Sequence, residues 1–210
     1  MATYSTIKGF NIQSLASDPE LSRAAGGAWS SGNPVVNARE DLAGGGIQTA
    51  GIIMGGTPSP LGAKTETYDG TSWSEVNNLT TGRFQNASST QGTLTAMITF
   101  GGYIPPATSK TNEEWDGTCW SEENDLNSAR RLPAGAGSST AALCIGGSTT
   151  GAPIGPGTTN ITEKWNGTSW TETGDLNTPR YSAAAAGTTT AALAYGGGGP
   201  DDESETSTVF

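Results

Sequence analysis

The side chains that could take part in catalysis form no complete catalytic set in this sequence. Serine and threonine are abundant, but the 210 residues include no histidine, the base that most often activates a hydroxyl nucleophile. The two cysteines, Cys119 and Cys144, have the spacing of neither a metal site nor a disulfide framework. We therefore expect no catalytic residue, no bound metal and no cofactor, and we interpret both thiols as structural.

Two groups of acidic residues remain as candidates for chemistry. Asp201 and Asp202 lie in an acidic cluster that could hold Ca²⁺, although the spacing of a calcium-binding loop is absent and a solvated run of charge is the simpler interpretation. Glu66, Glu113 and Glu163 could in principle supply the paired carboxylates of a glycosidase. These glutamates occupy equivalent positions of an internal repeat, however, which favours a structural role.

Arginine recurs at a fixed interval after tryptophan in the same repeat. The four pairs, each ten residues apart, are Trp29–Arg39, Trp73–Arg83, Trp120–Arg130 and Trp170–Arg180. We predict that the repeated glutamates accept hydrogen bonds from these arginines or from turn backbone. A partly buried pair of this kind would fix the orientation of each repeat unit.

A repeated hairpin positions these residues. Its copies cover 66–73, 113–120 and 163–170, and each contains an aromatic residue, then Asp-Gly or Asn-Gly, then tryptophan. Asp-Gly and Asn-Gly suit the tight turn of a β-hairpin, because they tolerate a positive φ. An apolar run ending in Gly-Gly stands before each hairpin, with a stretch of small residues upstream. The repeat therefore predicts four-stranded units whose innermost strands are built from small residues.

The two ends of the chain together supply the parts that a fourth unit needs. There are four Gly-Gly runs but only three complete hairpins. Trp29 occupies the tryptophan position of the repeat, and Phe210 stands where the preceding aromatic residue is expected. We predict an all-β propeller of about four four-stranded blades over residues 26–210, closed by an N-terminal strand that pairs with the C-terminal blade. Closure within one chain and a ring built with other subunits both remain open.

Residues 1–25 stand outside the repeat. Several large apolar residues occur there without the period of a strand or a helix. We predict an extended arm that docks on a partner or a neighbouring subunit, with a disordered tail as the alternative. The segment lacks the basic start and apolar core of a signal peptide, so we expect synthesis in a cytosol.

The overall charge argues against two classes of partner. The formal net charge is −10 at pH 7, and no basic patch is evident. Such a chain is a poor candidate for binding nucleic acid or anionic membrane surfaces. No apolar stretch approaches the length of a membrane span, so we expect no membrane insertion.

The segments between each Gly-Gly and the next hairpin vary in length and content, unlike the constant interval from tryptophan to arginine. Binding residues are often found on solvated loops of this kind, so we expect the ligand-binding surface there. The candidate residues are Pro58, Leu61, Tyr103, Ile104, Pro153, Ile154, Asp201 and Asp202. Exposed aromatic rings stack on sugars, and Tyr103 is the clearest aromatic residue in these loops.

The order of these features resembles the kelch repeat, whose units are four-stranded blades of a β-propeller. The resemblance covers about 26–210, with a shorter interval between the aromatic residue and tryptophan and fewer units than kelch propellers usually have. The sequences Asn-Asp-Leu-Asn-Ser-Ala-Arg, Thr-Ala-Ala-Leu and Asp-Gly-Thr-Ser-Trp are similar to those of kelch-like structural proteins of marine bacteriophages. The opening Met-Ala-Thr-Tyr is similar as well. This resemblance implies a component of the tail, a fibre or the capsid surface.

We therefore expect a non-enzymatic structural or adhesion protein of a virion, made in the host cytoplasm. Residues 1–25 would anchor it to other virion proteins, and it would form a homo-oligomer in the particle. Its variable loops would attach to a host surface glycan or protein, or to other virion proteins. A cellular kelch-type module for protein–protein interaction is the alternative, and a propeller enzyme acting on carbohydrate is a third possibility.

Overall fold

The computed structural model describes residues 31–58, 60–151 and 157–200. The chain divides into a first unit, Met1–Gly32, and a second unit, Asn33–Phe210, and every described strand belongs to the second. The predicted arm over 1–25 and the two residues predicted to close the fold, Trp29 and Phe210, therefore lie outside the described residues.

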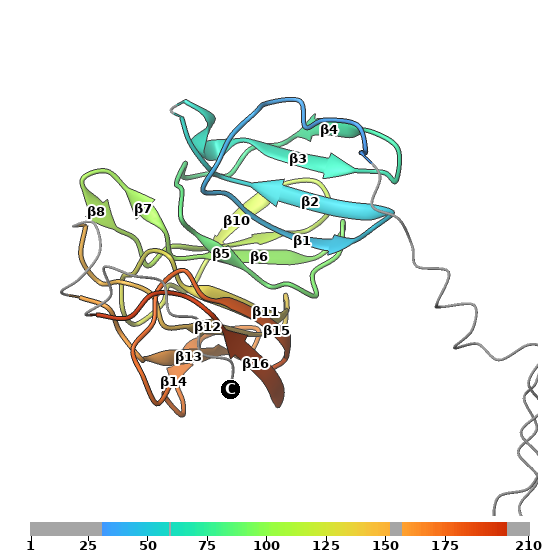
Figure 1. Cartoon of the computed structure of the whole chain (residues 1–210). Helices are drawn as coiled ribbons and strands as arrows, with labels where there is room; N and C mark the ends of the chain where they lie inside the picture. The colour runs from blue at the N-terminus through green and yellow to red at the C-terminus, as the bar shows by residue number, and fades with distance from the viewer. Residues whose placement is uncertain (1–30, 59, 152–156, 201–210) are drawn as a thin grey trace, which may run out of the picture. The chain divides into compact units, whose positions relative to one another are not determined.

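Three antiparallel four-stranded sheets follow one another along the chain, each with its strands in chain order (Figure 1). The first sheet contains β1 (Ala43–Ile47), β2 (Ala50–Met54), β3 (Thr65–Tyr68) and β4 (Trp73–Val76). The second contains β5 (Ala87–Ser88), β6 (Met97–Phe100), β9 (Asn112–Trp115) and β10 (Trp120–Glu123). The third contains β11 (Ala134–Ser138), β12 (Ala141–Ile145), β13 (Thr162–Trp165) and β14 (Trp170–Glu172).

Three smaller elements accompany these sheets. The hairpin of β7 (Tyr103–Ile104) and β8 (Ala107–Thr108) lies in the loop between β6 and β9, and a short 3-10 helix, η1 (Leu61–Ala63), lies between β2 and β3. The last sheet pairs β15 (Ala184–Thr188) with β16 (Ala191–Tyr195). The prediction of an all-β chain with several four-stranded antiparallel sheets is thus confirmed, and β15 and β16 repeat the first two strands of such a sheet.

The hairpin turns form as their side chains predict. Asp69 accepts hydrogen bonds from the backbone N–H groups of Thr71 and Ser72, both at 2.8 Å, and Gly70 follows with a φ of 93°. The N–H groups of Ser72 and Thr71 lower the pKa of Asp69, because they stabilise its charged form. The turn places Tyr68 opposite Trp73, with ring centroids 5.1 Å apart. Asp116 and Asn166 make the same turn contacts in the other two hairpins.

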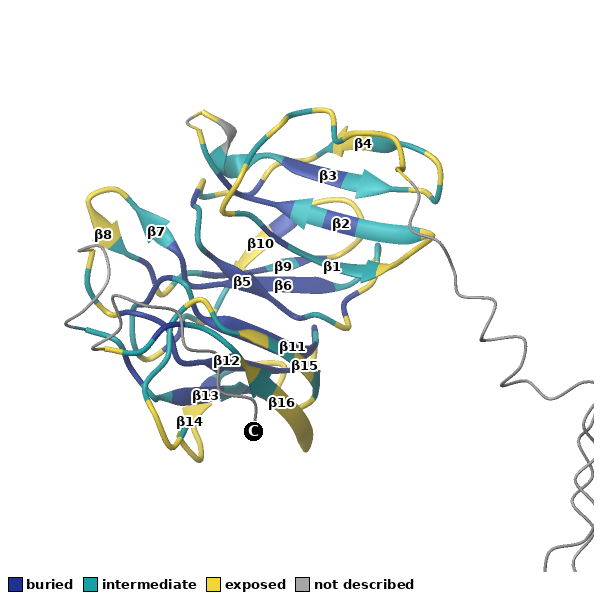
Figure 2. Ribbon diagram, viewed as in Figure 1, coloured by how far each residue is buried: buried dark blue, intermediate teal, exposed yellow. Residues whose placement is uncertain are grey.

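The core lies between consecutive sheets. Ile52 and Met54 of the first sheet pack with Trp115 and Trp120 of the second. Phe100 of the second sheet packs in the same way against the third, where its ring is 4.8 Å from that of Trp170. A third cluster joins β11 and β12 to residues of the last sheet. Figure 2 shows the resulting buried stretches along β6 and β12. Burial of these faces, rather than strand propensity, holds the sheets together.

Three of the Gly-Gly pairs, at 55–56, 101–102 and 146–147, end a second strand where the segment leading into the next sheet approaches closely. Gly101 has a φ of 64°, and a Cβ atom there would lie 2.8 Å from the carbonyl oxygen of Arg130. The following glycine, Gly102, donates its N–H to that same oxygen at 2.8 Å. The pairs 55–56 and 146–147 make the equivalent bonds to the carbonyls of Arg83 and Arg180. The first glycine is therefore required both for its positive φ and for its lack of a side chain.

This contact predicts a large loss of stability for Gly101→Ala. The added methyl group meets a backbone carbonyl and the backbone is held at a φ that alanine rarely adopts, so we expect the free energy of unfolding to fall by about 2 kcal/mol or more. Gly174→Ala is the matched control, because a Cβ there meets nothing within 4 Å. Urea denaturation of both variants tests the difference, and equal midpoints would contradict the close-approach argument.

Candidate binding surface

A buried pair of arginine and glutamate fastens each four-stranded sheet to the segment that leads into it. Arg39 lies 2.8 Å from Glu66, and Arg83 lies 2.9 Å from Glu113. Arg130 contacts Glu163 in the third sheet. The six side chains are at most 1% exposed. The predicted pairing of the repeated arginines with the repeated glutamates is thus confirmed for these three.

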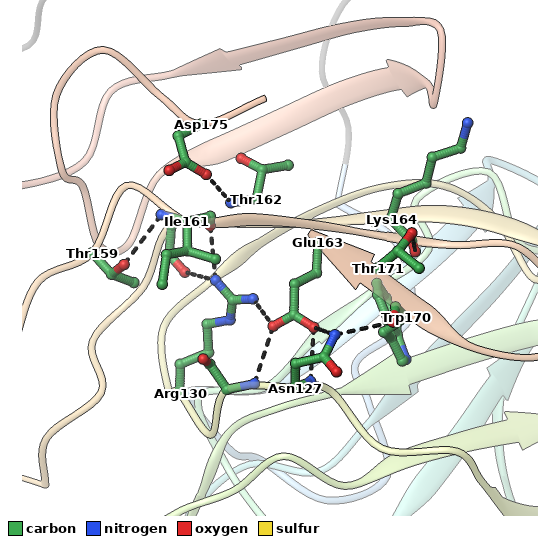
Figure 3. Close-up of polar contacts among 12 residues, drawn as sticks. Asn127, Arg130, Thr159, Ile161, Thr162, Glu163, Lys164, Trp170, Thr171 and Asp175 are labelled. Carbon is green, nitrogen blue, oxygen red and sulfur yellow. Dashed lines mark hydrogen bonds and ion pairs between the residues drawn. The ribbon is translucent and has the colours of Figure 1, made fainter. Parts of the chain in front are cut away.

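The carboxylate of each pair also accepts two consecutive backbone N–H groups. Figure 3 shows the third sheet, where Asn127 N–H donates to Glu163 Oε2 at 2.7 Å and Ser128 N–H donates to Oε1 at 3.2 Å. Val36 and Asn37 donate to Glu66 in the same way, and Thr80 and Thr81 donate to Glu113. These bonds offset the cost of burying the charge. The contacts support the structural interpretation of these glutamates.

Arg180 occupies the same position before the last sheet. Its guanidinium donates to the carbonyl oxygen of Gly196 at 2.9 Å, just as Arg130 donates to that of Gly146 at 3.3 Å. The residue two positions before Phe210, the place of the glutamate, is Thr208, which lies outside the described residues.

The position after each arginine forms a two-residue bridge with the position after each Gly-Gly. The four bridges are Glu40–Thr57, Phe84–Tyr103, Arg131–Ser148 and Tyr181–Gly198. In every bridge the two backbones exchange a pair of hydrogen bonds, at 2.7–3.2 Å. We name these eight residues the bridge surface. Its backbone is the same in all four repeats, whereas its side chains differ in size, charge and aromaticity.

Backbone contacts between consecutive bridges set their spacing. The residue that follows the first member of each bridge adopts a positive φ, 56° at Asp41, 57° at Gln85, 54° at Leu132 and 53° at Ser182. Gln85 donates its N–H to the carbonyl of Asp41 at 2.7 Å, and Leu132 donates to that of Gln85 at 2.8 Å. Ser182 donates to Leu132 at 2.9 Å. The bridge surface is therefore held on hydrogen-bonded backbone rather than on free loops.

A cavity opens beside the second bridge. Its volume is about 320 Å³, and its walls include Thr57, Pro60, Phe84, Tyr103 and Pro105. The rings of Phe84 and Tyr103 meet edge to face, 5.4 Å apart at an angle of 70°. Two prolines and two aromatic rings make the lining mainly apolar, which suits the apolar face of a ring-shaped ligand.

Four of the eight predicted binding residues fall in the described loops. Tyr103 lines the cavity, and Ile104 follows it in β7. Pro58 is exposed in the loop between β2 and β3, where Leu61 begins η1. Pro153, Ile154, Asp201 and Asp202 lie outside the described residues.

The sequence interpretation missed Phe84 and Pro105. Phe84 directly follows a repeated arginine and lies outside the variable segments in which the binding residues were predicted. Its equivalents in the other repeats are an acidic, a basic and a phenolic residue, Glu40, Arg131 and Tyr181. The arginine is the same in every repeat, whereas the residue after it differs. This contrast was the signal for a residue of the binding surface.

Comparison with known proteins adds no family assignment, because no protein-family model and no curated protein matches the chain. Over residues 31–58, 60–151 and 157–200, the structure has no helix of the length and apolarity that a membrane crossing requires. The same residues include no group of three or more histidine, cysteine, aspartate or glutamate side chains that could hold a metal ion.

The buried pairs predict a large cost for Glu113→Gln. The substitution leaves the Arg83 guanidinium buried without a counter-charge, so we expect the free energy of unfolding to fall by about 3 kcal/mol or more. Burial already lowers the pKa of Arg83, and Glu113 opposes that effect. Glu114→Gln, one residue along the same strand, is the control. Burial and the nearby Glu123 raise the pKa of Glu114, so its charged form is disfavoured in the fold. Removing that charge should leave the free energy of unfolding unchanged or raise it slightly. Equal losses in denaturant titrations would contradict the structural role of the pair.

Proposed function

We propose that this protein is a non-enzymatic structural and adhesion component of a bacteriophage particle, and that its bridge surface and neighbouring loops attach to a host glycan or protein. The observation that carries the proposal is a constant hydrogen-bonded backbone that presents a different side chain in each repeat. Such an arrangement separates the scaffold from the recognition surface, as binding loops on a rigid scaffold do.

The assignment to a virion rests on the resemblance of the repeat to kelch-like structural proteins of marine bacteriophages. Within this proposal, residues 1–25 anchor the chain to other virion proteins, and several copies assemble in the particle. The protein is made in the host cytoplasm and enters no membrane. Mass spectrometry of purified particles tests the assignment, because a virion protein must remain with the particle through density-gradient purification.

The Phe84–Tyr103 bridge is the strongest candidate for direct ligand contact. It combines two aromatic rings with an adjoining cavity of about 320 Å³. The apolar face of a pyranose ring stacks on such rings, while loop backbone and the Tyr103 hydroxyl remain for hydrogen bonds. This chemistry favours a glycan over a large flat protein surface.

We expect Tyr103→Ala to weaken attachment of the purified protein to host cells or surface glycans by about tenfold or more, because one aromatic anchor contributes about 1–2 kcal/mol to such a contact. Val36→Ala is the control, since Val36 is also exposed, at 57%, but lies outside the bridge surface. Titration of labelled protein on whole cells and on a glycan array provides the measurement. Unchanged attachment by Tyr103→Ala would contradict the site.

For the fold, we propose a kelch-like propeller of about four blades, closed by an N-terminal strand that pairs with the C-terminal blade. Two features support it: β15 and β16 reproduce the first two strands of the other sheets, and Ser182 continues the series of backbone bonds through Leu132 and Gln85 to Asp41. In the sequence repeat, residues 207–210 correspond to the third strand and Trp29 to the fourth strand of the other sheets.

Closure predicts that Trp29 contributes to stability as a core tryptophan does. We expect Trp29→Ala to lower the free energy of unfolding by about 3 kcal/mol or more, the usual cost of removing a buried tryptophan. Phe10→Ala, which removes an aromatic ring from the proposed arm, should leave the unfolding midpoint of the isolated protein unchanged. An unfolding midpoint of Trp29→Ala equal to that of the wild type would contradict closure by the N-terminal strand.

A further inference from the structure

The turn of the third hairpin contains the single Asn-Gly dipeptide of the sequence, Asn166-Gly167. The first and second hairpins have Asp-Gly at the same place, Asp69-Gly70 and Asp116-Gly117. Asn166 and Gly167 are exposed, whereas Trp165 and Trp170, the residues that begin and end this part of the hairpin, are buried. The dipeptide is therefore open to water, although the strands on both sides of it are fixed in the core.

Asparagine followed by glycine can lose its side-chain amide, because glycine has no side chain that hinders the approach of its nitrogen. The glycine nitrogen gives its proton to water or hydroxide and bonds to Cγ of the asparagine. The bond from Cγ to Nδ2 breaks, and the amide nitrogen takes a proton from water and leaves as ammonia. Water then opens the resulting succinimide ring. Cleavage at Cγ gives aspartate, and cleavage at the main-chain carbonyl carbon gives isoaspartate.

The third turn holds Asn166 in a geometry that assists this attack. Its Oδ1 accepts the backbone N–H groups of Thr168 and Ser169, both at 2.9 Å. The side chain must therefore fold back over the nitrogen of Gly167, which lies between them in the chain. The same two N–H groups point at the oxygen on which negative charge develops when Cγ becomes tetrahedral. Donors fixed at this distance stabilise such an oxyanion.

Two further hydrogen bonds keep these donors in position. Asn124 donates a side-chain N–H to the carbonyl oxygen of Thr168 at 2.7 Å. Asn166 donates its backbone N–H to the carbonyl oxygen of Ser169 at 3.2 Å. The N–H of Gly167, in contrast, donates to none of the described residues. The turn thus fixes the groups that stabilise the oxyanion, while the nitrogen that must lose its proton is exposed.

The aspartate turns share this geometry without sharing its reactivity. Oδ1 of Asp69 accepts the N–H groups of Thr71 and Ser72, both at 2.8 Å. These N–H groups lower the pKa of Asp69, so its carboxyl group stays charged. A carboxylate is a poor target for a nucleophile, whereas the neutral amide of Asn166 has no such protection.

Asn127 is an asparagine of the same chain that the fold protects. It precedes another small residue, Ser128, but the N–H of Ser128 donates to Glu163 Oε1 at 3.2 Å. The side-chain amide of Asn127 donates to Glu163 Oε2 at 2.8 Å and to the carbonyl oxygen of Trp170 at 3.0 Å. A backbone nitrogen whose proton binds a buried carboxylate does not lose it readily, so we expect Asn127 to be stable.

We propose that Asn166 is a site of spontaneous deamidation in the folded protein, and that its turn accepts the aspartate product. Aspartate already occupies this position in the other two hairpins, where it makes the same two hydrogen bonds. Isoaspartate would lengthen the main chain at the turn and move the oxygen away from both N–H groups. The reaction adds one negative charge to the third hairpin. The inference is independent of the proposed function.

Peptide mapping of the full-length protein after incubation at mildly alkaline pH measures the reaction. Asn166 should be converted to aspartate and isoaspartate at least about tenfold faster than Asn127. The share of aspartate should be larger than in the chain unfolded in urea. Asp69→Asn gives the first turn the sequence of the third, so this variant should gain a second reactive position. Asn166→Asp should melt at neutral pH at the wild-type temperature or slightly above it, because the turn N–H groups stabilise a carboxylate that is charged at that pH.

Four results would overturn the proposal. The first is an unmodified Asn166 in the folded protein after a time in which the urea-unfolded chain converts it, since the turn would then be protective. The second is an equal rate of conversion at Asn166 and Asn127. The third is absence of conversion in the first turn of Asp69→Asn, when circular dichroism shows the variant to be folded. The fourth is a clearly lower melting temperature of Asn166→Asp, which would show that the turn rejects the product.

Discussion

The lead-in arginine is the residue on which the arrangement of the sheets depends. Arg130 uses its guanidinium to hold Glu163 of its own sheet and its carbonyl to receive the N–H of Gly102 from the preceding sheet. One residue thus fixes a sheet both to its lead-in segment and to its neighbour. Burying a guanidinium is costly, and Nε of Arg39, Arg83 and Arg130 makes no hydrogen bond in the described structure. The gain is therefore in fixed geometry more than in net stability.

This fixed geometry explains why the surface next to the arginine can vary. The bridge residues receive their backbone hydrogen bonds from each other, and the following positive-φ residues connect consecutive bridges. The hydrogen bonds of each bridge are made by backbone atoms alone. Selection can therefore place Glu40, Phe84, Arg131 or Tyr181 at equivalent positions without altering the scaffold. The repeated arginines stabilise the fold, whereas the bridge residues that follow them are available for recognition.

The sequence alone was sufficient for the sheets and for the buried pairs, because both repeat at fixed intervals. The interval between Asp-Gly and tryptophan predicted the hairpin turns. The constant interval from tryptophan to arginine predicted the pairs of arginine and glutamate. Repeat position also identified 183–186 as mainly strand, although four alanines favour a helix in isolation. The bridges could not be predicted, because they join residues about twenty positions apart through backbone atoms alone. The cavity depends on how two sheets pack, and no single repeat encodes that.

Among the described residues, the first and last sheets expose more of their apolar side chains than the two sheets between them. Trp115, Trp120, Trp165 and Trp170 are at most 5% exposed, whereas Tyr68 and Trp73 of the first sheet are only half-buried. In the last sheet, where β16 pairs with β15 alone among the described strands, Leu193 and Tyr195 are exposed. Their equivalents in the third sheet, Leu143 and Ile145, are buried. The same apolar positions are thus buried where residues of a following sheet pack on them, as Ala183, Ala185 and Ala194 do on the cluster that contains Leu143 and Ile145.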